Sequence, residues 1–219
     1  MFIDLDTSIP MLENRGHTIN DPWDVVDIFE KEVADYAGSK YAVSVDNCTD
    51  ALFLCLKYLK AVGEVTIPQR TYMSVPATII AAGCKVNFVN KAWSGVYSLS
   101  PYPIIDGATR FTKDMYEKDT YHCLSFHKKK LLSIGKGGMI LTDDKVAYEW
   151  FRLARYSGRD ISVPFKDMPE PTVLGWNMYM PPEQAALGLE LFYNMEEYNE
   201  DMAGSEDYPD LSLCRIYYG

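Results

Sequence analysis

Apolar side chains recur along the chain at two different spacings, and these spacings predict helices that alternate with strands. Between residues 26 and 36 the apolar positions follow the helical period. Asp21 and Pro22 precede that run and favour the start of a helix, whereas Gly38 follows it and favours the end. We therefore predict a first clear helix that begins near Pro22 and ends before Gly38.

The rest of the chain continues this alternation. Helices are predicted at 49–61, 74–82 and 182–195, and another runs from a cap at Asp143 or Asp144 to about 155. Short apolar strands are predicted at 41–45, 65–68, 85–89, 103–105, 121–126 and 139–142. This order predicts an α/β fold with a mostly parallel central sheet and helices on both faces. No internal repeat or Gly/Ser linker interrupts the pattern, so a single domain over residues 1–219 is expected.

Charge and cysteine content narrow the class of protein. The net charge of −10 disfavours nucleic acid and anionic membranes as partners, because both would repel an acidic protein. No apolar run reaches the length of a membrane span, and the first ten residues are acidic where a signal peptide would be basic. The five cysteines are scattered and odd in number, which predicts reduced thiols and a cytoplasmic location.

One group of residues invites a metal-site interpretation. His122, Cys123 and His127 lie close together in the sequence. No second cluster is present to complete a coordination shell, so packing and incidental surface positions explain these residues better. No metal site is predicted.

Five polar segments end or follow predicted strands, which are the positions at which α/β sheets bind ligands. They are DNCT at 46–49, QRTY at 69–72, DGAT at 106–109, SFHKKK at 125–130 and GKGG at 135–138. Each segment alone has a plain structural explanation, such as a strand end, a solvated basic turn or a hairpin. Their order and identity together indicate a ligand site.

In this order the segments resemble the DegT/StrS family of sugar aminotransferases, which depend on pyridoxal 5′-phosphate (PLP). The segment FEKEVADYAGSKYAVSVDNCTDAL is similar to the family's approach to its S-G-T-x-A-L turn, and PQRTYMSVPATIIAAGCKVNFVN and IIDGAT follow. SFHKKKLLSIGKGGMILTDD resembles the family's S-F-H-x-x-K and G-E-G-G, and LGWNMYMPPEQAALGLELF its G-x-N-x-R-M and Q-A-A-x-G-x-x-Q-L. The resemblance spans about residues 29–192 and implies the core of the fold-type-I large domain.

The resemblance implies a catalytic pair. Lys130 corresponds to the lysine that carries PLP as a Schiff base, a bond that needs an unprotonated amine. The cofactor's positive ring and the neighbouring Lys128 and Lys129 are expected to disfavour the ammonium form of Lys130. Asp106 is expected to face the ring nitrogen and hold its proton, so that the ring can act as an electron sink.

Further contacts with the cofactor are implied by the same resemblance. Tyr72 is expected to stack on the ring. The backbone at Cys48 and Thr49 opens a predicted helix and is expected to bind the phosphate, with help from the hydroxyls of Thr49 and Ser125. Thr109 is expected to reach the ring hydroxyl.

The sequence departs from the family pattern at single positions near the expected site. Cys48 replaces the usual glycine of the phosphate turn, and Gly107 and Thr109 alter the segment after the ring aspartate. Lys136 stands where glutamate is common, and Tyr179 stands where arginine is usual.

Two segments are shorter than in the family. Only NKAWSGVYSLSPYP separates Val89 from Ile104, and after Phe192 the family continues into a C-terminal domain that helps to enclose the substrate. The chain is therefore expected to be a shortened member, with a core over residues 21–200 and a C-terminal remnant over 201–219.

The resemblance implies transfer of an amino group from an amino-acid donor, expected to be glutamate, to a keto-sugar that is nucleotide-linked in carbohydrate biosynthesis. Asn177 corresponds to an asparagine that reaches the phosphate of a second subunit, which predicts a homodimer with shared active sites. Three alternatives stay open: another PLP reaction such as racemisation or elimination, a binding or regulatory role without catalysis, and an unrelated α/β nucleotide-binding protein.

Overall fold

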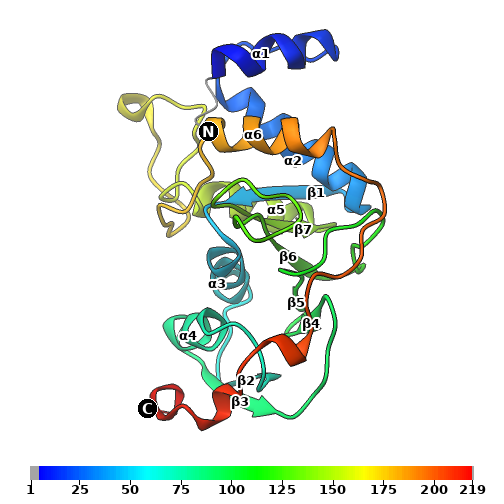
Figure 1. The fold of residues 1–219 in the computed structure, drawn as a ribbon. Helices are drawn as coiled ribbons and strands as arrows, with labels where there is room; N and C mark the ends of the chain where they lie inside the picture. Colours follow the sequence, from blue (N-terminus) through cyan, green and yellow to red (C-terminus); the bar gives the residue numbers. More distant parts are fainter. Residues whose placement is uncertain (1–4, 219) are drawn as a thin grey trace.

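The strands of the protein form a five-stranded mixed sheet and a two-stranded parallel sheet beside it. The computed structural model describes residues 5–218. Five strands pair in the order β1 (Tyr41–Val45), β7 (Gly138–Thr142), β6 (Tyr121–Ser125), β5 (Ile104–Asp106) and β4 (Tyr97–Ser98). The strands β2 (Glu64–Pro68) and β3 (Lys85–Val89) pair with each other, and a bridge between Thr66 and Ser100 joins them to the β4 side. Figure 1 shows this order from β1 near the top to β3 near the bottom.

The strand directions differ from the mostly parallel sheet that was expected. Within the five-stranded sheet only β5 and β6 pair in parallel, whereas β7 is antiparallel to both neighbours and β4 is antiparallel to β5. Residues 126–137, between β6 and β7, form turns without a helix. A parallel return usually needs a longer crossover that contains a helix, so the chain reverses at this point. The α/β class is confirmed, with strands of mixed direction.

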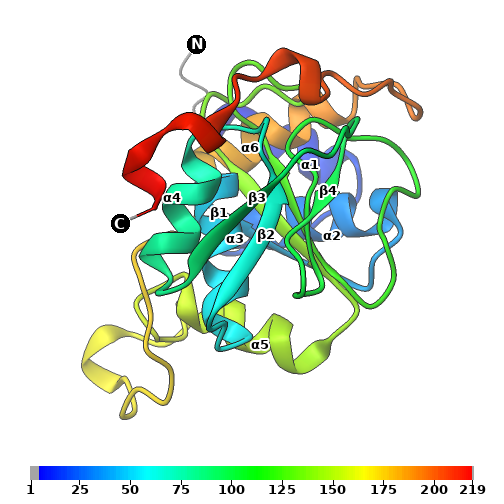
Figure 2. The same cartoon turned by 90° about the horizontal axis from the view of Figure 1, so that it is seen from below.

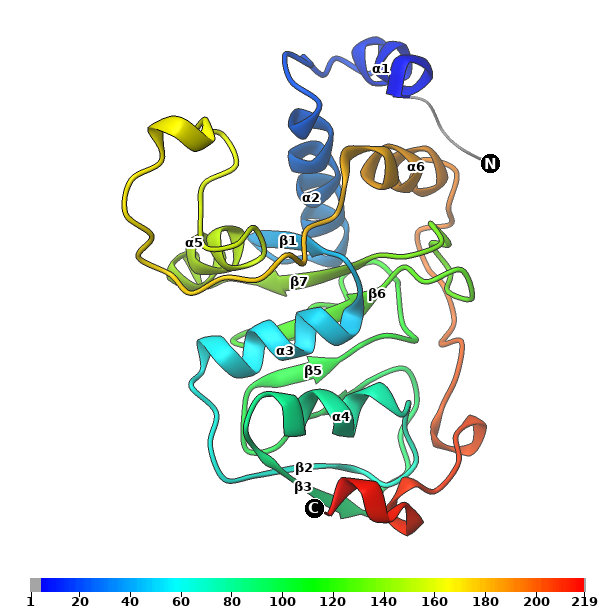
Figure 3. The same cartoon turned by 90° about the vertical axis from the view of Figure 1, so that its left-hand side faces the viewer.

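Helices cover both faces of the sheet, as expected. On one face lie α1 (Leu5–Asn14), α2 (Trp23–Ala37) and α6 (Pro182–Phe192), which enclose a core that includes Phe29 and Phe126. On the other face lie α3 (Cys48–Tyr58), α4 (Ser74–Ala81) and α5 (Lys145–Ala154), around a core that includes Phe151. Figure 3 shows α3 and α4 on the side away from α2 and α6. The short 3-10 helices are η1 (Phe165–Asp167), η2 (Ser205–Asp207), η3 (Leu211–Leu213) and η4 (Arg215–Tyr217).

Local end signals place the end of α2 and the start of α5 where the sequence predicted them, whereas α3 and α6 each end three residues before the predicted position. Gly38 adopts a left-handed conformation with φ 86°, and its N–H donates to the carbonyl of Ala34 at 2.9 Å. Asp144 caps α5, because its carboxylate accepts from the amides of Val146 and Ala147. The structure also contains α1 and β4, which were not predicted.

A buried ion pair ties β1 to the helices around it. Arg155, at the end of α5, contacts the carboxylate of Glu30 from α2, and both side chains are almost fully buried. Ser44 of β1 completes the cluster: its amide donates to Glu30 at 2.8 Å, and its carbonyl accepts from Arg155 at 2.7 Å. The end of β1, which leads into the DNCT segment, is thereby fixed in place.

The C-terminal segment, residues 199–218, follows the edge of the sheet on which the DGAT and QRTY segments lie. Arg110 holds Asp201 with two hydrogen bonds of 2.7 and 2.8 Å. Further along, the amide of Leu211 donates to the carbonyl of Gln69 at 2.8 Å. Figure 2 shows the last part of this segment beside α4. The predicted remnant is thus packed against the core, and the predicted single-domain organisation stays a prediction.

Candidate active site

Asp106 lies at the end of β5 and is buried, with 5% of its surface exposed. Its Oδ1 accepts from the amide of Ala108 at 3.0 Å, and its Oδ2 accepts from the hydroxyl of Tyr97 at 2.5 Å. Burial raises the pKa of Asp106, whereas these two donors and the nearby Lys130 act to lower it. The carboxylate is therefore held in one orientation by donors on both oxygens.

Lys130 is the partly buried member of the three-lysine run, and it lies close enough to Asp106 for their charges to interact. Lys128 and Lys129 are exposed, whereas Lys130 is partly buried, and its amide donates to the carbonyl of His127 at 2.8 Å. Burial lowers the pKa of Lys130, and the proximity of Asp106 and Cys48 acts in the opposite direction. A lowered pKa was expected, but its cause is burial of Lys130 rather than repulsion from the two exposed lysines.

The first turn of α3 presents free backbone amides close to this pair. The side chain of Asn47 caps the helix by accepting from the amide of Asp50 at 2.9 Å. Within residues 5–218, the amides of Cys48 and Thr49 have no acceptor, as is usual at a helix start. A Cβ on Gly138 would lie 2.4 Å from the carbonyl carbon of Asn47, so glycine is needed for β7 to pass this turn. The turn can bind an anion such as a phosphate.

Two hydroxyls and one ion pair surround the same turn. The Oγ1 of Thr49 lies 2.7 Å from the Oγ of Ser74, at the start of α4. Lys136 contacts the carboxylate of Asp46, just before the turn. Burial and the neighbouring Asp46 raise the pKa of Asp50. Lys136, which stands where the family commonly has glutamate, thus offsets the negative charge of Asp46 beside the anion site.

Cys48 connects the turn to Asp106. Its Sγ lies 3.9 Å from the Oδ1 of Asp106, and burial raises the pKa of the thiol well above its ordinary value. The thiol therefore stays neutral, and its side chain occupies space that a glycine would leave open. This contact explains how the departure at position 48 is accommodated.

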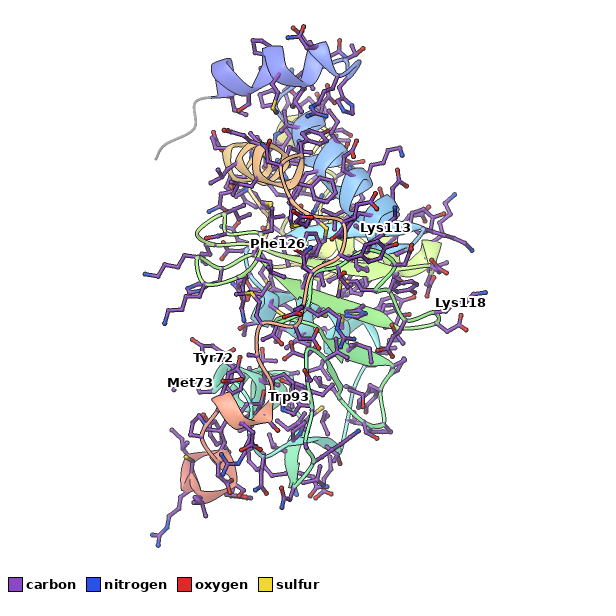
Figure 4. The ribbon with its side chains drawn as sticks, turned by 45° about the vertical axis from the view of Figure 1, so that its right-hand side comes forward. Tyr72, Met73, Trp93, Lys113, Lys118 and Phe126 are labelled. Carbon is purple, nitrogen blue, oxygen red and sulfur yellow. The ribbon has the colours of Figure 1, made fainter. Side chains whose placement is uncertain are left out.

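Tyr72 and Ser125 lie at the border of this cluster. Tyr72 is 60% exposed on the segment after β2, and the neighbouring Met73 accepts a hydrogen bond from the hydroxyl of Tyr217 at 3.2 Å. Figure 4 shows Tyr72 and Met73 at the end of the molecule that carries Trp93 and the C-terminal segment. Ser125 ends β6 and is partly buried, opposite Gly138 in the ladder.

Thr109 binds the C-terminal segment, whereas Asn177 lies beside Met178, whose carbonyl accepts from the amide of Asp46 at 2.8 Å. The buried hydroxyl of Thr109 donates to the carbonyls of Gly95 at 3.0 Å and Ala203 at 3.2 Å, so it binds the C-terminal segment rather than facing Asp106. Asn177 is exposed and forms an antiparallel backbone bridge with Tyr156. The expected contact of Thr109 with the ring hydroxyl stays a prediction, and it would require this hydroxyl to give up a carbonyl partner.

Sequence reasoning missed Tyr97, which touches Asp106 directly. Tyr97 stands opposite Asp106 in the β4–β5 pairing, and its hydroxyl also lies 2.5 Å from the Oγ1 of Thr71. Its ring packs against Trp93 at 4.8 Å between centroids. Two-residue strands carry no periodic signal, so no local pattern in the sequence indicates this contact.

The suggested metal ligands are separated in the structure. His122 is fully buried and packs against Gly107: a Cβ added to Gly107 would lie 2.4 Å from the Nε2 of His122. His127, in contrast, is exposed. Burial lowers the pKa of His122 to about 4. Across the part of the chain that the structure describes, no group of three or more His, Cys, Asp or Glu side chains could hold a metal ion.

Comparison with known proteins places the chain in a family. A model of the DegT/DnrJ/EryC1/StrS aminotransferase family matches residues 13–102 and 105–204. The chain belongs to this family. It is 27% identical over 236 residues to the spore coat polysaccharide biosynthesis protein SpsC of Bacillus subtilis (strain 168), covering 80% of this chain and 59% of SpsC. It is 28% identical over 223 residues to the GDP-perosamine synthase of Caulobacter vibrioides, covering 81% of this chain and 58% of the synthase.

A solved structure shows the same architecture. The sugar aminotransferase CalS13 from Micromonospora echinospora superimposes with a TM-score of 0.64 at 18% identity, covering 87% of this chain and 65% of CalS13. The fold-type-I architecture implied by the sequence is therefore confirmed. The chain spans less than three fifths of the length of the two curated relatives. Among residues 5–218, no helix combines the length and apolar character that a membrane crossing requires.

Proposed function

We propose that the protein is a PLP-dependent aminotransferase that moves an amino group from an amino-acid donor, such as glutamate, to a nucleotide-linked keto-sugar. One observation carries the proposal. Of the three consecutive lysines, only the one that matches the family's cofactor lysine is partly buried, and it lies close enough to the buried Asp106 for their charges to interact. Cys48, at the start of α3 where the amides are free, contacts Asp106. The family and its sugar-processing relatives support the substrate class.

The residues present fit PLP. The amides of Cys48 and Thr49 would hold its phosphate, and the hydroxyls of Thr49 and Ser74 would add donors. Asp106 would face the ring nitrogen and keep its proton in place. When bound, PLP supplies an electron sink for the carbon from which the amino group is removed.

Lys130 would both hold the cofactor and move the proton of the reaction. Burial favours its neutral amine, which is the form that can bond to a carbonyl carbon. The same amine, when not bonded to the cofactor, would accept a proton from the donor's α-carbon and return it. The exposed Lys128 and Lys129 lack this environment.

Reduced cysteines, four of them buried, support a cytoplasmic location.

The proposal predicts the site of covalent attachment. Borohydride reduction of the protein mixed with PLP should leave the pyridoxyl group on Lys130, as read by peptide mass spectrometry. A Lys130→Ala variant is expected to lose this adduct, whereas Lys129→Ala, a matched control in the same run, should keep it. An adduct mainly on Lys128 or Lys129 would contradict the assignment. Failure of glutamate to remove the visible band of the bound cofactor would exclude glutamate as the donor.

We also infer that two copies of the chain share their active sites. Asn177 is exposed at the base of the segment between α5 and α6, where the adjacent Trp176 and Met178 form backbone hydrogen bonds with the end of α5. The middle of this segment extends away from the body of the molecule in Figures 2 and 3. In a two-fold dimer, a projecting segment of each copy can reach the other reciprocally.

The dimer predicts that PLP binding depends on protein concentration. Affinity for PLP should fall on dilution, and Asn177→Ala should weaken it further, by about tenfold for loss of a hydrogen bond to a charged group. The exposed Asn20→Ala serves as the control, and sedimentation equilibrium reports the assembly state. A monomer that binds PLP with undiminished affinity would rule this arrangement out.

A further inference from the structure

The hydroxyl of Tyr97 joins Asp106 to a second hydroxyl. The distances from its oxygen to the Oδ2 of Asp106 and to the Oγ1 of Thr71 are both 2.5 Å. An ionised carboxylate can only accept, so the Tyr97 proton points to Asp106 and the Thr71 hydroxyl donates to Tyr97. The result is a two-step donor relay, Thr71 to Tyr97 to Asp106, with all three side chains buried.

The ring of Tyr97 has little freedom to leave this position. Trp93 packs against it, and the indole N–H of Trp93 donates to the carbonyl of Arg70 at 2.8 Å. The ring of Trp93 also packs against the ring of Tyr208 in the C-terminal segment, with centroids 5.5 Å apart. Tyr97 is therefore held by the short segment before β5 and by the C-terminal segment together.

The charges around Asp106 make this donor important. The titratable groups that face it are Cys48 of α3, Lys130 after β6, Cys123 of β6, Tyr208 of the C-terminal segment and Tyr97 itself. Burial raises the pKa of Tyr97 well above its ordinary value, so the phenol keeps its proton. Burial also raises the pKa of Asp106, and the Tyr97 hydrogen bond is the strongest influence that opposes it.

We propose that Tyr97 is the positioning residue of the ring aspartate: it orients the Asp106 carboxylate and keeps it ionised, so that a bound pyridine ring retains its nitrogen proton. The inference rests on the proposed function and extends it to a residue of β4. Tyr97 touches neither substrate nor cofactor in this account. It acts through Asp106, and the relay from Thr71 strengthens its donor character.

A carboxyl titration of the PLP-free protein tests the first half of the proposal. With the ¹³C signal of Asp106 assigned from Asp106→Asn, Tyr97→Phe should raise the pKa of Asp106 by about one unit, because the ionised form loses a buried donor. Tyr121→Phe is the matched control: it removes a hydroxyl that lies on the neighbouring strand and donates to Asp144 at 3.0 Å. An Asp106 titration unchanged by Tyr97→Phe overturns the proposal.

The pH dependence of the visible band in the PLP-loaded protein tests the second half. When the ring nitrogen is protonated in a smaller fraction of molecules, the nitrogen joined to Lys130 becomes more basic. Tyr97→Phe should therefore raise the pH at the midpoint of the change in the visible band. Asp106→Asn should raise it further. The double variant should shift no further than Asp106→Asn alone, because Tyr97 acts through Asp106. A double shift equal to the sum overturns the proposal.

Two further outcomes keep the test decisive. If Tyr97→Phe does not fold, Thr71→Val keeps the Tyr97 ring and should raise the pKa of Asp106 in the same direction by less. An unchanged titration in Thr71→Val then overturns the proposal. If the wild-type protein shows no visible band with PLP, the proposed function fails, and the carboxyl titration still decides whether Tyr97 controls Asp106.

Discussion

Asp106→Asn is expected to leave the fold intact and to lower the rate of amino transfer by about a thousandfold. The amide has nearly the size and shape of the carboxylate: its oxygen can accept from the amide of Ala108, and its NH2 can donate to the Tyr97 hydroxyl, which then turns its proton toward Thr71. It carries no charge, however, and cannot hold a proton on the ring nitrogen electrostatically. Without that proton the ring withdraws electrons poorly from the reacting carbon.

Single-turnover kinetics with a donor amino acid, followed by absorbance, would measure this effect. Asp114→Asn is a suitable control, because Asp114 is exposed on the loop after β5 and has a positive φ of 56° that asparagine tolerates. Circular dichroism would confirm that both variants are folded. Turnover at the wild-type rate in Asp106→Asn would show that another residue faces the ring nitrogen.

Arg155→Met is expected to lower the free energy of unfolding by about 3–5 kcal/mol, the cost of leaving a buried charge without its partner. Glu30 would keep the hydrogen bonds from Ser44 and the longer contact with Arg152 at 3.8 Å, but it would lose Arg155, its closest and most deeply buried counter-ion. Urea unfolding followed by fluorescence would measure the change.

Lys31→Met provides the matched control for that measurement. Lys31 pairs with Asp35 on the exposed face of the same helix, α2, and an exposed pair contributes about 0.3–0.5 kcal/mol. A loss for Arg155→Met as small as that of Lys31→Met would show that water or another group compensates Glu30.

The elements that the sequence predicted well are those with local signals. Gly38 and Asp144 terminate or start helices through contacts with residues at most four positions away, so the chain itself contains the information. Lys130 and Asp106 were identifiable because ordered motifs surround them. They lie close together because Asp106 ends β5, Lys130 follows β6, and these two strands are neighbours in the sheet.

What the sequence did not predict depends on contacts between distant residues. The reversal of β7 could have been inferred from the absence of a helix in residues 126–137, a signal that the strand-helix alternation obscured. The role of Tyr97 could not, because it follows from a cross-strand pairing of two very short strands. Thr109 was assigned to the cofactor by position in a motif, but its hydroxyl is bound by the backbone at Gly95 and Ala203.

The path of residues 199–218 has a consequence for how the protein is made. Arg110, Trp93 and Gln69 each depend on a partner in this segment: Asp201, Tyr208 and Asp210 respectively. A ribosome synthesises these partners after β5 and β6, which have left the exit tunnel by then. The wall around Asp106 therefore closes only after residues 199–218 have followed, so a ligand beside Asp106 can be enclosed only once this segment has been made.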